Sequence, residues 1–285
     1  MDIRFEILKL HGVWALTHSG PDLLPFDSRE AALVAALHAA RQHHESDGGH
    51  ATVHLWDSKS ETTVFDTGET RRPEAPGALR GLSLKIAIVG AAGRTGSELV
   101  KQALNRGHVV RALAHHRLPN ITQEGVTWLT GSVEDLSTLK RLIDDCDLAI
   151  SAIGPRPGHE DVCSTATKEL LEAGVRRLIV VSGMAVTLPG DRKGLLDRIS
   201  SMMVAAMAPK VFKDKVRELE LLRASATDWT AVRVGMLTDR GTIRPAKADL
   251  HRPPGIGINT ASLAAFCLDE AENARFPRSA PFAST

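Results

Sequence analysis

The sequence predicts a doubly wound α/β fold built on a parallel sheet, preceded by a small α+β module. From Lys85 onward, runs rich in Val, Ile and Leu alternate with amphipathic helical patterns, which is typical of parallel sheets covered on both faces. The first of these runs leads into a turn with three glycines, in the stretch "KIAIVGAAGRTGSELV". Residues 67–83 contain Pro, Gly and Arg without periodicity, which indicates a linker between the two parts.

Size and charge exclude several classes of protein. A chain of 285 residues is long enough for one large domain and a small one. With 35 basic and 34 acidic residues the net charge is +1, too small for nucleic-acid binding through bulk electrostatics. No apolar stretch approaches the roughly 20 residues of a membrane helix, and the start "MDIRFEILKL" resembles neither a signal peptide nor a presequence. Three scattered cysteines indicate reduced thiols, so we expect a cytoplasmic protein without nucleic-acid or membrane partners.

Residues 1–66 are expected to form a strand–helix–hairpin module. "GVWALTHSG" has the pattern of a strand, and the helical stretch "FDSREAALVAALHAARQHH" has Asp27 and Glu30 at capping-box spacing. The apolar stripe of this helix consists of Ala32, Leu33, Ala36, Leu37 and Ala40. "ATVHLWD" and "ETTVFDT" indicate a hairpin around the turn "SKS". The module resembles a small bacterial domain family without assigned activity.

Four histidines of this module, His43, His44, His50 and His54, raise the question of a metal site. Metal ligands need convergent geometry and supporting hydrogen bonds, and the sequence gives no sign of either. The alternative is a helix end that runs into a glycine-rich loop. We therefore expect no metal site.

Residues 84–274 are predicted to form the α/β domain, followed by a tail at residues 275–285. The expected strands, in chain order, are residues 84–90, 108–114, 125–131, 146–154, 176–183 and 228–237. The expected helices are one that ends at residue 103, and then residues 132–145, 164–175, 216–226 and 260–273. In an open parallel sheet, ligands bind beyond the carboxyl ends of the strands, where the strand order reverses.

The glycine turn lies at such a place, between the first strand of this sheet and its first helix. Gly90 would allow a tight turn, Gly93 would let the backbone approach a pyrophosphate, and Gly96 would let the helix pack closely. The start of the helix offers free N–H groups and a positive dipole end to the phosphates. The glycine turn follows an apolar strand, precedes a helix and is followed by further strand–helix units. In this context a dinucleotide is the expected ligand.

The choice between NADP and NAD depends on the end of the second strand, where an NAD site usually has Asp or Glu. The stretch "VVRALAHHRLPN" has no carboxylate there and offers His115, His116 and Arg117 instead. Arg94 projects from the glycine turn, and a guanidinium suits a 2′-phosphate. We expect NADP rather than NAD, although the same side chains could simply be exposed loop residues.

The spacing Gly90-x-x-Gly93-x-x-Gly96, with "GRTG" inside it, resembles the atypical short-chain dehydrogenase/reductases. Within them, the chain is similar to the NAD(P)H-binding branch of flavin/biliverdin-IXβ reductases and nitrogen-metabolite-repressor-like redox sensors. The stretches "GSVED", "DLAISAIG", "AGVRRLIVVSG" and "LLRASATDWTAVRVGML" agree in the same order, over residues 84 to about 270. The resemblance implies a Rossmann fold with cofactor contacts at Gly90, Gly93, Arg94, Thr95, Gly96, His115, Ser132, Ala152, Ile153, Gly154, Ser182 and Gly235. The chain departs from the family at two of them, with His115 for a frequent Arg and Ser132 for a usual Asp, and also at Val234, before Gly235, where the family commonly has Pro.

Short-chain dehydrogenases typically use Tyr-x-x-x-Lys with a Ser, and this chain keeps only part of that set. The matching positions are Val211 and Lys215, and the sequence contains no tyrosine at all. This excludes the ordinary alcohol–ketone mechanism, because valine cannot transfer a proton. The matching serine, Ser182, is present at the end of its strand, so Ser182 and Lys215 are the candidate catalytic residues. Lys215 could equally be a solvent-facing lysine.

Two further stretches lie near the expected site. Arg156 and His159 follow the strand that ends in "AIG" and could donate protons or serve as plain loop residues. In "LLDRISSMMVAAMAPKVF" an apolar stripe with three methionines could form a lid over a flat acceptor, or belong to the core or a subunit contact. The stripe consists of Leu195, Ile199, Met202, Met203 and Met207.

Two functions from different classes follow from these observations. The first is an NADPH-dependent oxidoreductase that transfers hydride to a flavin, a quinone or a similar conjugated acceptor, which needs little help from a protein acid. The second is a non-catalytic NADP(H)-binding redox sensor that acts through a protein partner or as a homo-oligomer. The missing tyrosine and the N-terminal module favour the second function, whereas Ser182 and the methionine stripe favour the first.

Overall fold

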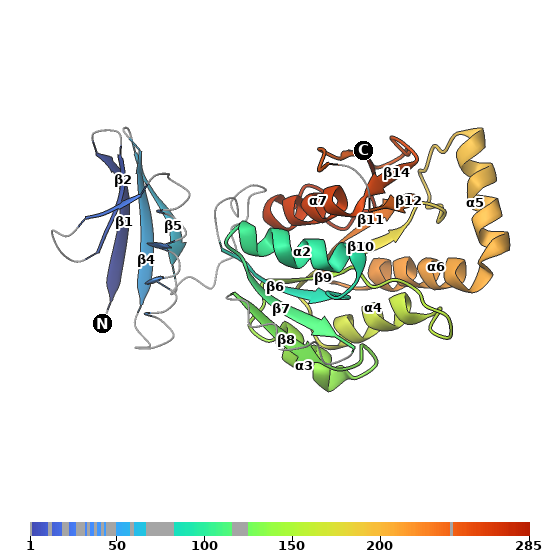
Figure 1. The fold of residues 1–285 in the computed structure, drawn as a ribbon, viewed down its shortest axis with the longest axis horizontal. Helices are drawn as coiled ribbons and strands as arrows, with labels where there is room; N and C mark the ends of the chain where they lie inside the picture. Colours follow the sequence, from blue (N-terminus) through green and yellow to red (C-terminus); the bar gives the residue numbers. More distant parts are fainter. Residues whose placement is uncertain are drawn as a thin grey trace. The chain divides into compact units, whose positions relative to one another are not determined.

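The computed structural model divides the chain into two compact units, Met1–Ser83 and Leu84–Thr285, which are described separately (Figure 1). The structure describes residues 2–10, 13–18, 23–26, 32, 35, 36, 39, 40, 43, 50–57, 60–66, 83–115, 125–239 and 242–285. Of the features expected from the sequence, the capping pair Asp27 and Glu30 and almost all of the linker lie outside these residues.

The first unit is a five-stranded sheet within its described residues, with the order β3-β2-β1-β4-β5. The strands are β1 (Ile3–Leu10), β2 (Val13–His18), β3 (Leu24–Phe26), β4 (Ala51–Asp57) and β5 (Ser60–Asp66). β1 and β4 are parallel, while the hairpin β4–β5 is antiparallel. Helical Ala32, Ala36 and Ala40 are fully buried in one cluster with Phe5 and Ile7. The expected module included β2 and the hairpin but not β1 or β3, although the alternation of apolar and charged residues in β1 is itself a strand pattern.

The second unit is built on an eight-stranded, mostly parallel sheet among its described residues, with the order β13-β15-β11-β10-β9-β6-β7-β8. Its strands are β6 (Lys85–Val89), β7 (Val109–Ala114), β8 (Val126–Thr130), β9 (Leu148–Ser151), β10 (Arg177–Gly183), β11 (Asp228–Val234), β13 (Lys247–Asp249) and β15 (Phe282–Ser284). A separate parallel pair consists of β12 (Met236–Thr238) and β14 (Gly257–Asn259). From β8 to β11 the order corresponds to 3-2-1-4-5-6, the arrangement of a Rossmann fold, with its switch point between β6 and β9.

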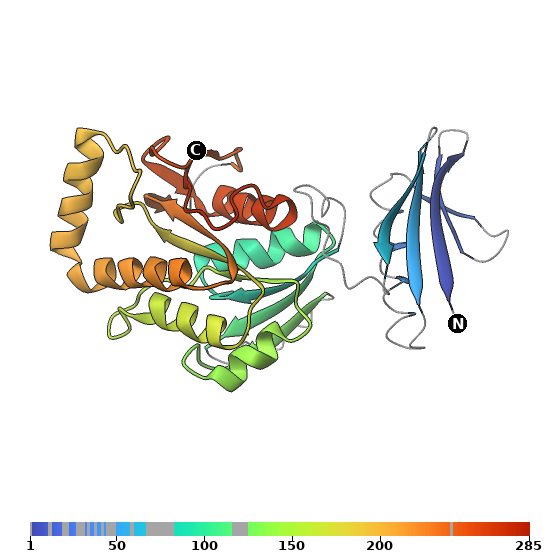
Figure 2. The same ribbon diagram turned by 180° about the vertical axis from the view of Figure 1, so that it is seen from behind.

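Helices cover both faces of this sheet, as Figures 1 and 2 show from opposite sides. They are α2 (Arg94–Asn105), α3 (Leu136–Ile143), α4 (Val162–Glu172), α5 (Leu195–Met207), α6 (Pro209–Ala224) and α7 (Thr260–Asn273). α2 packs with α7 on one face, and α4 packs with α3 and α6 on the other. The central strands β6 and β9 are mostly apolar, with Ile86, Ile88 and Ile150 fully buried, because both faces of the sheet are covered there. This arrangement confirms the doubly wound α/β fold.

The end of the chain differs from the expected tail. β15 pairs in parallel with β11 and antiparallel with β13, so residues 282–284 belong to the sheet. Phe282 is fully buried, and the Arg233 guanidinium lies 3.6 Å from the centroid of its ring. A strand of three residues is too short to give a recognisable apolar period, which is why the sequence pattern did not indicate it.

Candidate functional site

A pocket in the described part of the second unit lies at the carboxyl ends of β6, β7, β8 and β9, at the switch point of the sheet. Its volume is about 710 Å³, which suits a ligand larger than a single small metabolite. The residues that line it are Gly90, Ala92, Gly93, Arg94, Thr95, Leu113, Ala114, His115, Gly131, Ser132, Val133, Glu134, Ala152, Ile153, Gly154, Pro155, Arg156, His159, Val162 and Leu237.

Two positions of the glycine turn need glycine for steric reasons. Gly90 has φ +77°, and a Cβ there would lie 2.9 Å from the main-chain nitrogen of Ile153. A Cβ at Gly96 would collide with the carbonyl oxygen of Gly90. The first glycine thus brings the turn against the segment that follows β9, and the last brings α2 down onto the turn. The result is a main-chain wall on one side of the pocket.

The start of α2 can hold an anion. Gly93 is the N-cap without a side-chain cap, and the first turn of α2, all of it described, has no acidic residue. The first helical hydrogen bond runs from Ser97 N–H to Gly93 O at 2.8 Å, so the N–H groups of Arg94, Thr95 and Gly96 precede the helical ladder. These amide groups and the helix dipole favour a phosphate at this end.

The charged groups of the pocket are mostly cationic. Arg94 is well exposed at the mouth, and its Nη1 lies 3.2 Å from Oδ2 of Asp239, which follows β12. His115 directly follows β7, where an NAD site usually has a carboxylate. Glu134, beyond β8, is the one carboxylate among the described lining residues, and its N–H donates to Ser132 Oγ at 3.2 Å. The described lining therefore holds two guanidinium groups, those of Arg94 and Arg156, and one carboxylate, which favours a phosphate.

The wall of the pocket opposite the glycine turn is formed by the residues that follow β9. Ala152, Ile153 and Gly154 line the pocket directly after that strand. Beyond them, the main chains of Arg156 and His159 are hydrogen-bonded to each other, with His159 N–H donating to Arg156 O at 2.9 Å. Both side chains are exposed and line the far end of the pocket, so they remain candidates for contact with a second ligand.

The two candidate catalytic residues lie elsewhere, in a buried cluster between β10 and α6. Ser182 Oγ donates a hydrogen bond to Oε2 of Glu218 at 2.9 Å. Lys215 Nζ donates to the same Oε2 at 3.1 Å and to the carbonyl oxygen of Val181 at 2.9 Å. All three side chains are buried, and none is among the described residues that line the pocket. This placement differs from the expected contact with cofactor and acceptor.

The electrostatics of the cluster explain how it is held. Burial raises the pKa of Glu218, against the opposing effects of Lys215 and Ser182. Burial lowers the pKa of Lys215, but the charge and hydrogen bonding of Glu218 and Cys163 together outweigh burial and keep that pKa above its ordinary value. Nearby, burial raises the pKa of the Cys163 thiol to about 12, so this cysteine is not a thiolate at neutral pH. Lys215 and Glu218 therefore compensate each other and fasten α6 to β10.

Most of the cofactor residues implied by the resemblance come together in the pocket, and a few do not. Nine of them line it, namely Gly90, Gly93, Arg94, Thr95, His115, Ser132, Ala152, Ile153 and Gly154. Gly96 lies behind the turn, Ser182 lies in the buried cluster, and Gly235 packs against the main chain of Ile256. Of the groups expected near a 2′-phosphate, His116 and Arg117 lie outside the described residues.

Sequence reasoning missed Glu134, Leu237 and the buried Glu218. In an NAD site a carboxylate was expected only at the end of the second strand, whereas Glu134 follows the third. Leu237 lines the pocket from β12, a strand of only three residues. Glu218 belongs to a helix with many charged residues, a pattern typical of a solvent-exposed helix, and is nevertheless buried. The described His, Cys, Asp and Glu side chains form no group of three that could hold a metal ion. None of the described helices has the length and apolar character needed to cross a membrane.

Comparison with known proteins identifies the family. Residues 90–274 match the model of the NAD(P)H-binding family, which covers more than half of the chain. Among curated proteins, an uncharacterised protein of Bacillus subtilis, YwnB, is 33% identical over 104 residues, which are 35% of this chain and 47% of that protein. The chain spans less than half of the length of the curated relatives it matches.

Two solved structures are similar in fold. ChuY, an anaerobillin reductase from Escherichia coli O157:H7, is 20% identical with a TM-score of 0.58, over 70% of this chain and 96% of that one. A candidate NADH-flavin reductase from Streptococcus pneumoniae TIGR4 is 20% identical with a TM-score of 0.59, over 71% of this chain and 99% of that one. At this identity the likeness establishes the Rossmann-like fold of the second unit.

Proposed function

Since this chain belongs to the NAD(P)H-binding family, we propose that it is an NADPH-dependent oxidoreductase that passes hydride to a conjugated acceptor such as a flavin or a quinone. The observation that carries this proposal is the pocket at the switch point, with the uncapped start of α2 on one wall and Ala152–Gly154 on the other. Such a pocket is long enough for a dinucleotide and has its anion-binding donors in the main chain.

The surface charge favours NADPH over NADH. The residues at the end of β7 are Ala114 and His115, so no carboxylate is present there to accept a hydrogen bond from a ribose 2′-hydroxyl. The Arg94 guanidinium is exposed beside the glycine turn and can turn from Asp239 to a phosphate. A dianionic 2′-phosphate would bind such a group more strongly than a hydroxyl would.

The chain itself contributes positioning rather than acid–base chemistry. Bound NADPH would supply the hydride, and the pocket would hold its ring at contact distance from the acceptor. Flavins and quinones delocalise the incoming charge and take a proton from solvent, so the absence of tyrosine is no obstacle. Ser182 and Lys215 act in this proposal through Glu218, by fixing the end of β10, and not by contact with the acceptor.

An assay of NADPH oxidation tests the proposal. Purified protein is mixed with NADPH and FMN or a naphthoquinone, and the absorbance of the reduced nicotinamide is followed. A Cβ at Gly154 would meet nothing within 4 Å, so Gly154→Val should fold normally while its side chain narrows the pocket. We expect turnover by the wild type, partial loss in Gly154→Ala and near-complete loss in Gly154→Val. Unchanged turnover in Gly154→Val would contradict the assignment of the pocket.

A second candidate function is a non-catalytic NADP(H) sensor that acts through a protein partner. It is favoured by the absence of tyrosine and by the burial of Ser182 and Lys215 away from the pocket. A sensor should bind oxidised and reduced nucleotide with different affinity and turn over none of the acceptors. Turnover of a flavin or a quinone would reject the sensor, whereas differential affinity without turnover would reject the oxidoreductase.

A further inference from the structure

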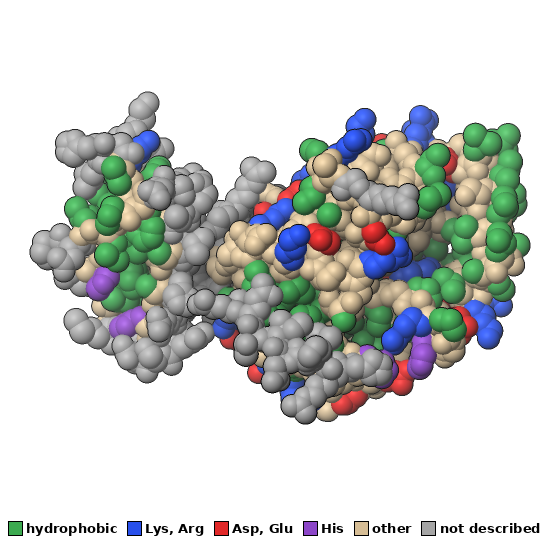
Figure 3. Space-filling model, in the orientation of Figure 1, with side chains coloured by type: hydrophobic (Ala, Val, Ile, Leu, Met, Phe, Trp, Pro, Cys, Tyr) green, Lys and Arg blue, Asp and Glu red, His purple; other side chains and the backbone are tan. Residues whose placement is uncertain are grey.

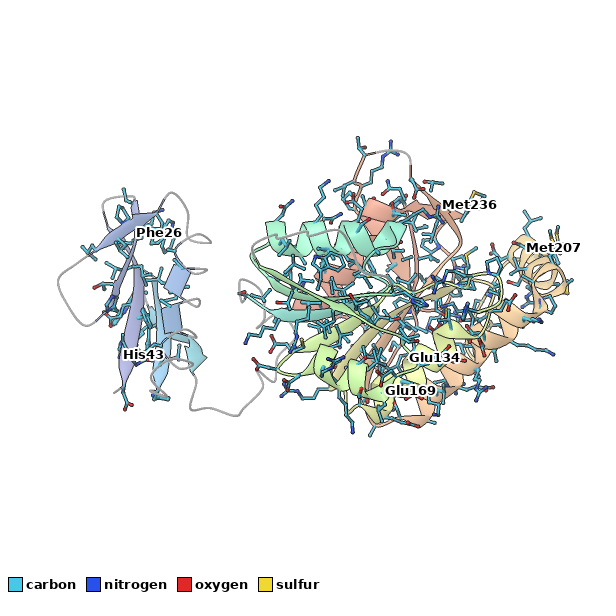
Figure 4. The ribbon with its side chains drawn as sticks, turned by 60° about the horizontal axis from the view of Figure 1, so that its bottom comes forward. Phe26, His43, Glu134, Glu169, Met207 and Met236 are labelled. Atoms are coloured by element: carbon cyan, nitrogen blue, oxygen red, sulfur yellow. The ribbon has the colours of Figure 1, made fainter. Side chains whose placement is uncertain are left out.

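The helix α5 presents its apolar side to solvent. Seven large side chains on it are exposed, by between 42% and 81%. We call them the α5 outer face, which consists of Leu195, Leu196, Ile199, Met202, Met203, Val204 and Met207. Figure 3 shows hydrophobic side chains gathered along this helix, and Figure 4 labels Met207 at its end. No residue of α5 is buried, which is unusual for a helix with so many apolar side chains.

The opposite side of α5 is the one that faces the protein. The partly buried positions of the helix, Asp197, Ser201 and Ala205, are four residues apart and are polar or small. Ser201 Oγ lies 3.1 Å from Nζ of the buried Lys193, which also donates to the carbonyl oxygen of Met184 at 2.7 Å. The orientation of α5 is therefore fixed by a polar anchor, and it turns the methionines outward and not toward the pocket.

An outward apolar helix face calls for a partner, because burial against other elements supplies most of the stability of protein helices. The α5 outer face exposes on the order of 800 Å² of side-chain surface, which is what one partner contributes to a standard interface. No charged residue occurs between Ile199 and Met207, and methionine is enriched at interface cores. A membrane-surface helix would instead carry a strongly charged face, which α5 lacks.

We propose that the α5 outer face is the interface of a homodimer, in which a second copy of this chain packs its own α5 outer face against it. A two-fold pairing is self-complementary by symmetry, so the same uncharged patch serves both copies. Each copy then shields the apolar surface of the other. The pocket of the second unit is lined by other residues and stays open to its ligand.

A charge placed on the α5 outer face tests the proposal. Met203→Glu puts a carboxylate at a side chain that is 57% exposed, and Ile243→Glu is the matched control, because Ile243 is 56% exposed and lies outside α5. The full chain is studied by sedimentation velocity over a wide range of concentration, and NADPH binding serves as a check of folding. We expect twice the 30.7 kDa chain mass for the wild type and for Ile243→Glu. We expect Met203→Glu to dissociate, with a dimer dissociation constant raised by a factor on the order of a hundred or more, and to bind NADPH normally.

Two outcomes would overturn the proposal. One is a wild-type chain that is monomeric at every concentration, including the case in which it binds vesicles of phosphatidylcholine and phosphatidylglycerol instead. The other is a Met203→Glu dimer as tight as that of the wild type. A cross-linking experiment gives an independent readout, because Cys146, Cys163 and Cys267 are all buried. A bismaleimide should then link two copies of Met203→Cys and leave Ile243→Cys unlinked.

Discussion

Lys215→Met tests whether the buried cluster is structural or catalytic. In the wild type, the Lys215 ammonium lies 3.1 Å from a Glu218 carboxylate whose side chain is only 1% exposed. The substitution leaves that carboxylate buried with Ser182 as its remaining side-chain donor. Removing one partner of a buried ion pair costs about 3–5 kcal/mol. We expect the free energy of unfolding of the second unit to fall by roughly that amount, and a Lys215→Met/Glu218→Leu variant to regain much of it.

The assay is urea unfolding followed by tryptophan fluorescence. Because the chain has two compact units, its unfolding need not be a single transition. Trp14 and Trp56 belong to the first unit and Trp128 and Trp229 to the second, so Trp14→Phe/Trp56→Phe makes the signal specific for the second unit. NADPH affinity is measured in parallel under conditions where the variant is folded, and it should be unchanged.

The reasoning would be refuted by the opposite pair of results. If Lys215→Met changed the stability of the second unit by less than about 1 kcal/mol while NADPH turnover collapsed, the ion pair would not be structural. Lys215 would then act on the ligands, as its match to the short-chain dehydrogenase pattern implies.

Three further expectations concern other parts of the second unit. Arg94→Ala should weaken NADPH binding by about tenfold or more while it changes NADH binding little, since a charge-assisted hydrogen bond contributes about 1.5–3 kcal/mol; equal losses in calorimetric titrations would remove Arg94 from the 2′-phosphate. Glu272→Gln should make the free energy of unfolding of the second unit less dependent on pH in the acid range. Burial raises the pKa of Glu272, but His108 and Arg106 outweigh it, so the pKa lies below its ordinary 4.5, and the stability it adds is present above pH 4.5 and lost as the pH falls below that value; an unchanged pH dependence in urea titrations at several pH values would contradict this. Phe282→Ala should lower the free energy of unfolding of the second unit by about 3–5 kcal/mol, because the ring of Phe282 is fully buried in β15. A negligible change in that free energy would contradict the inclusion of β15 in the sheet and would mean that residues 275–285 are a tail.

Sequence patterns located the sheet because its strands are covered on both faces. Runs such as "KIAIV" and "RLIVV" are apolar after their first residue, so their extent is visible in the sequence. β15 was not predicted from the sequence, since three residues give no recognisable period. Its Phe282 also packs against Arg233, which is distant in the sequence. The stretch 195–212, which was notable for its apolar stripe, contains α5 and the start of α6, because Pro209 begins a new helix after Ala208 leaves the helical conformation.

The site was predictable where main-chain geometry decides it. Gly90 and Gly96 are required by a turn that packs against Ile153 and against itself, and such constraints leave a fixed spacing in the sequence. The burial and contacts of Ser182 and Lys215 were not predictable, since they depend on Glu218, three residues beyond Lys215 on the inner side of α6. The outward direction of α5 likewise depends on the Lys193 anchor, which no local pattern reveals.

In the proposed function, the amide groups at the start of α2 hold the phosphates of a nicotinamide dinucleotide, and the wall after β9 bounds the same pocket. Equilibrium dialysis of the full chain against NADPH, with Gly154→Val alongside, tests it most directly. We expect one nucleotide bound per wild-type chain and strongly reduced binding to a Gly154→Val variant that unfolds at the same urea concentration. A wild-type chain that retains neither NADPH nor NADH, or a Gly154→Val variant that binds as tightly as the wild type, would contradict the claim.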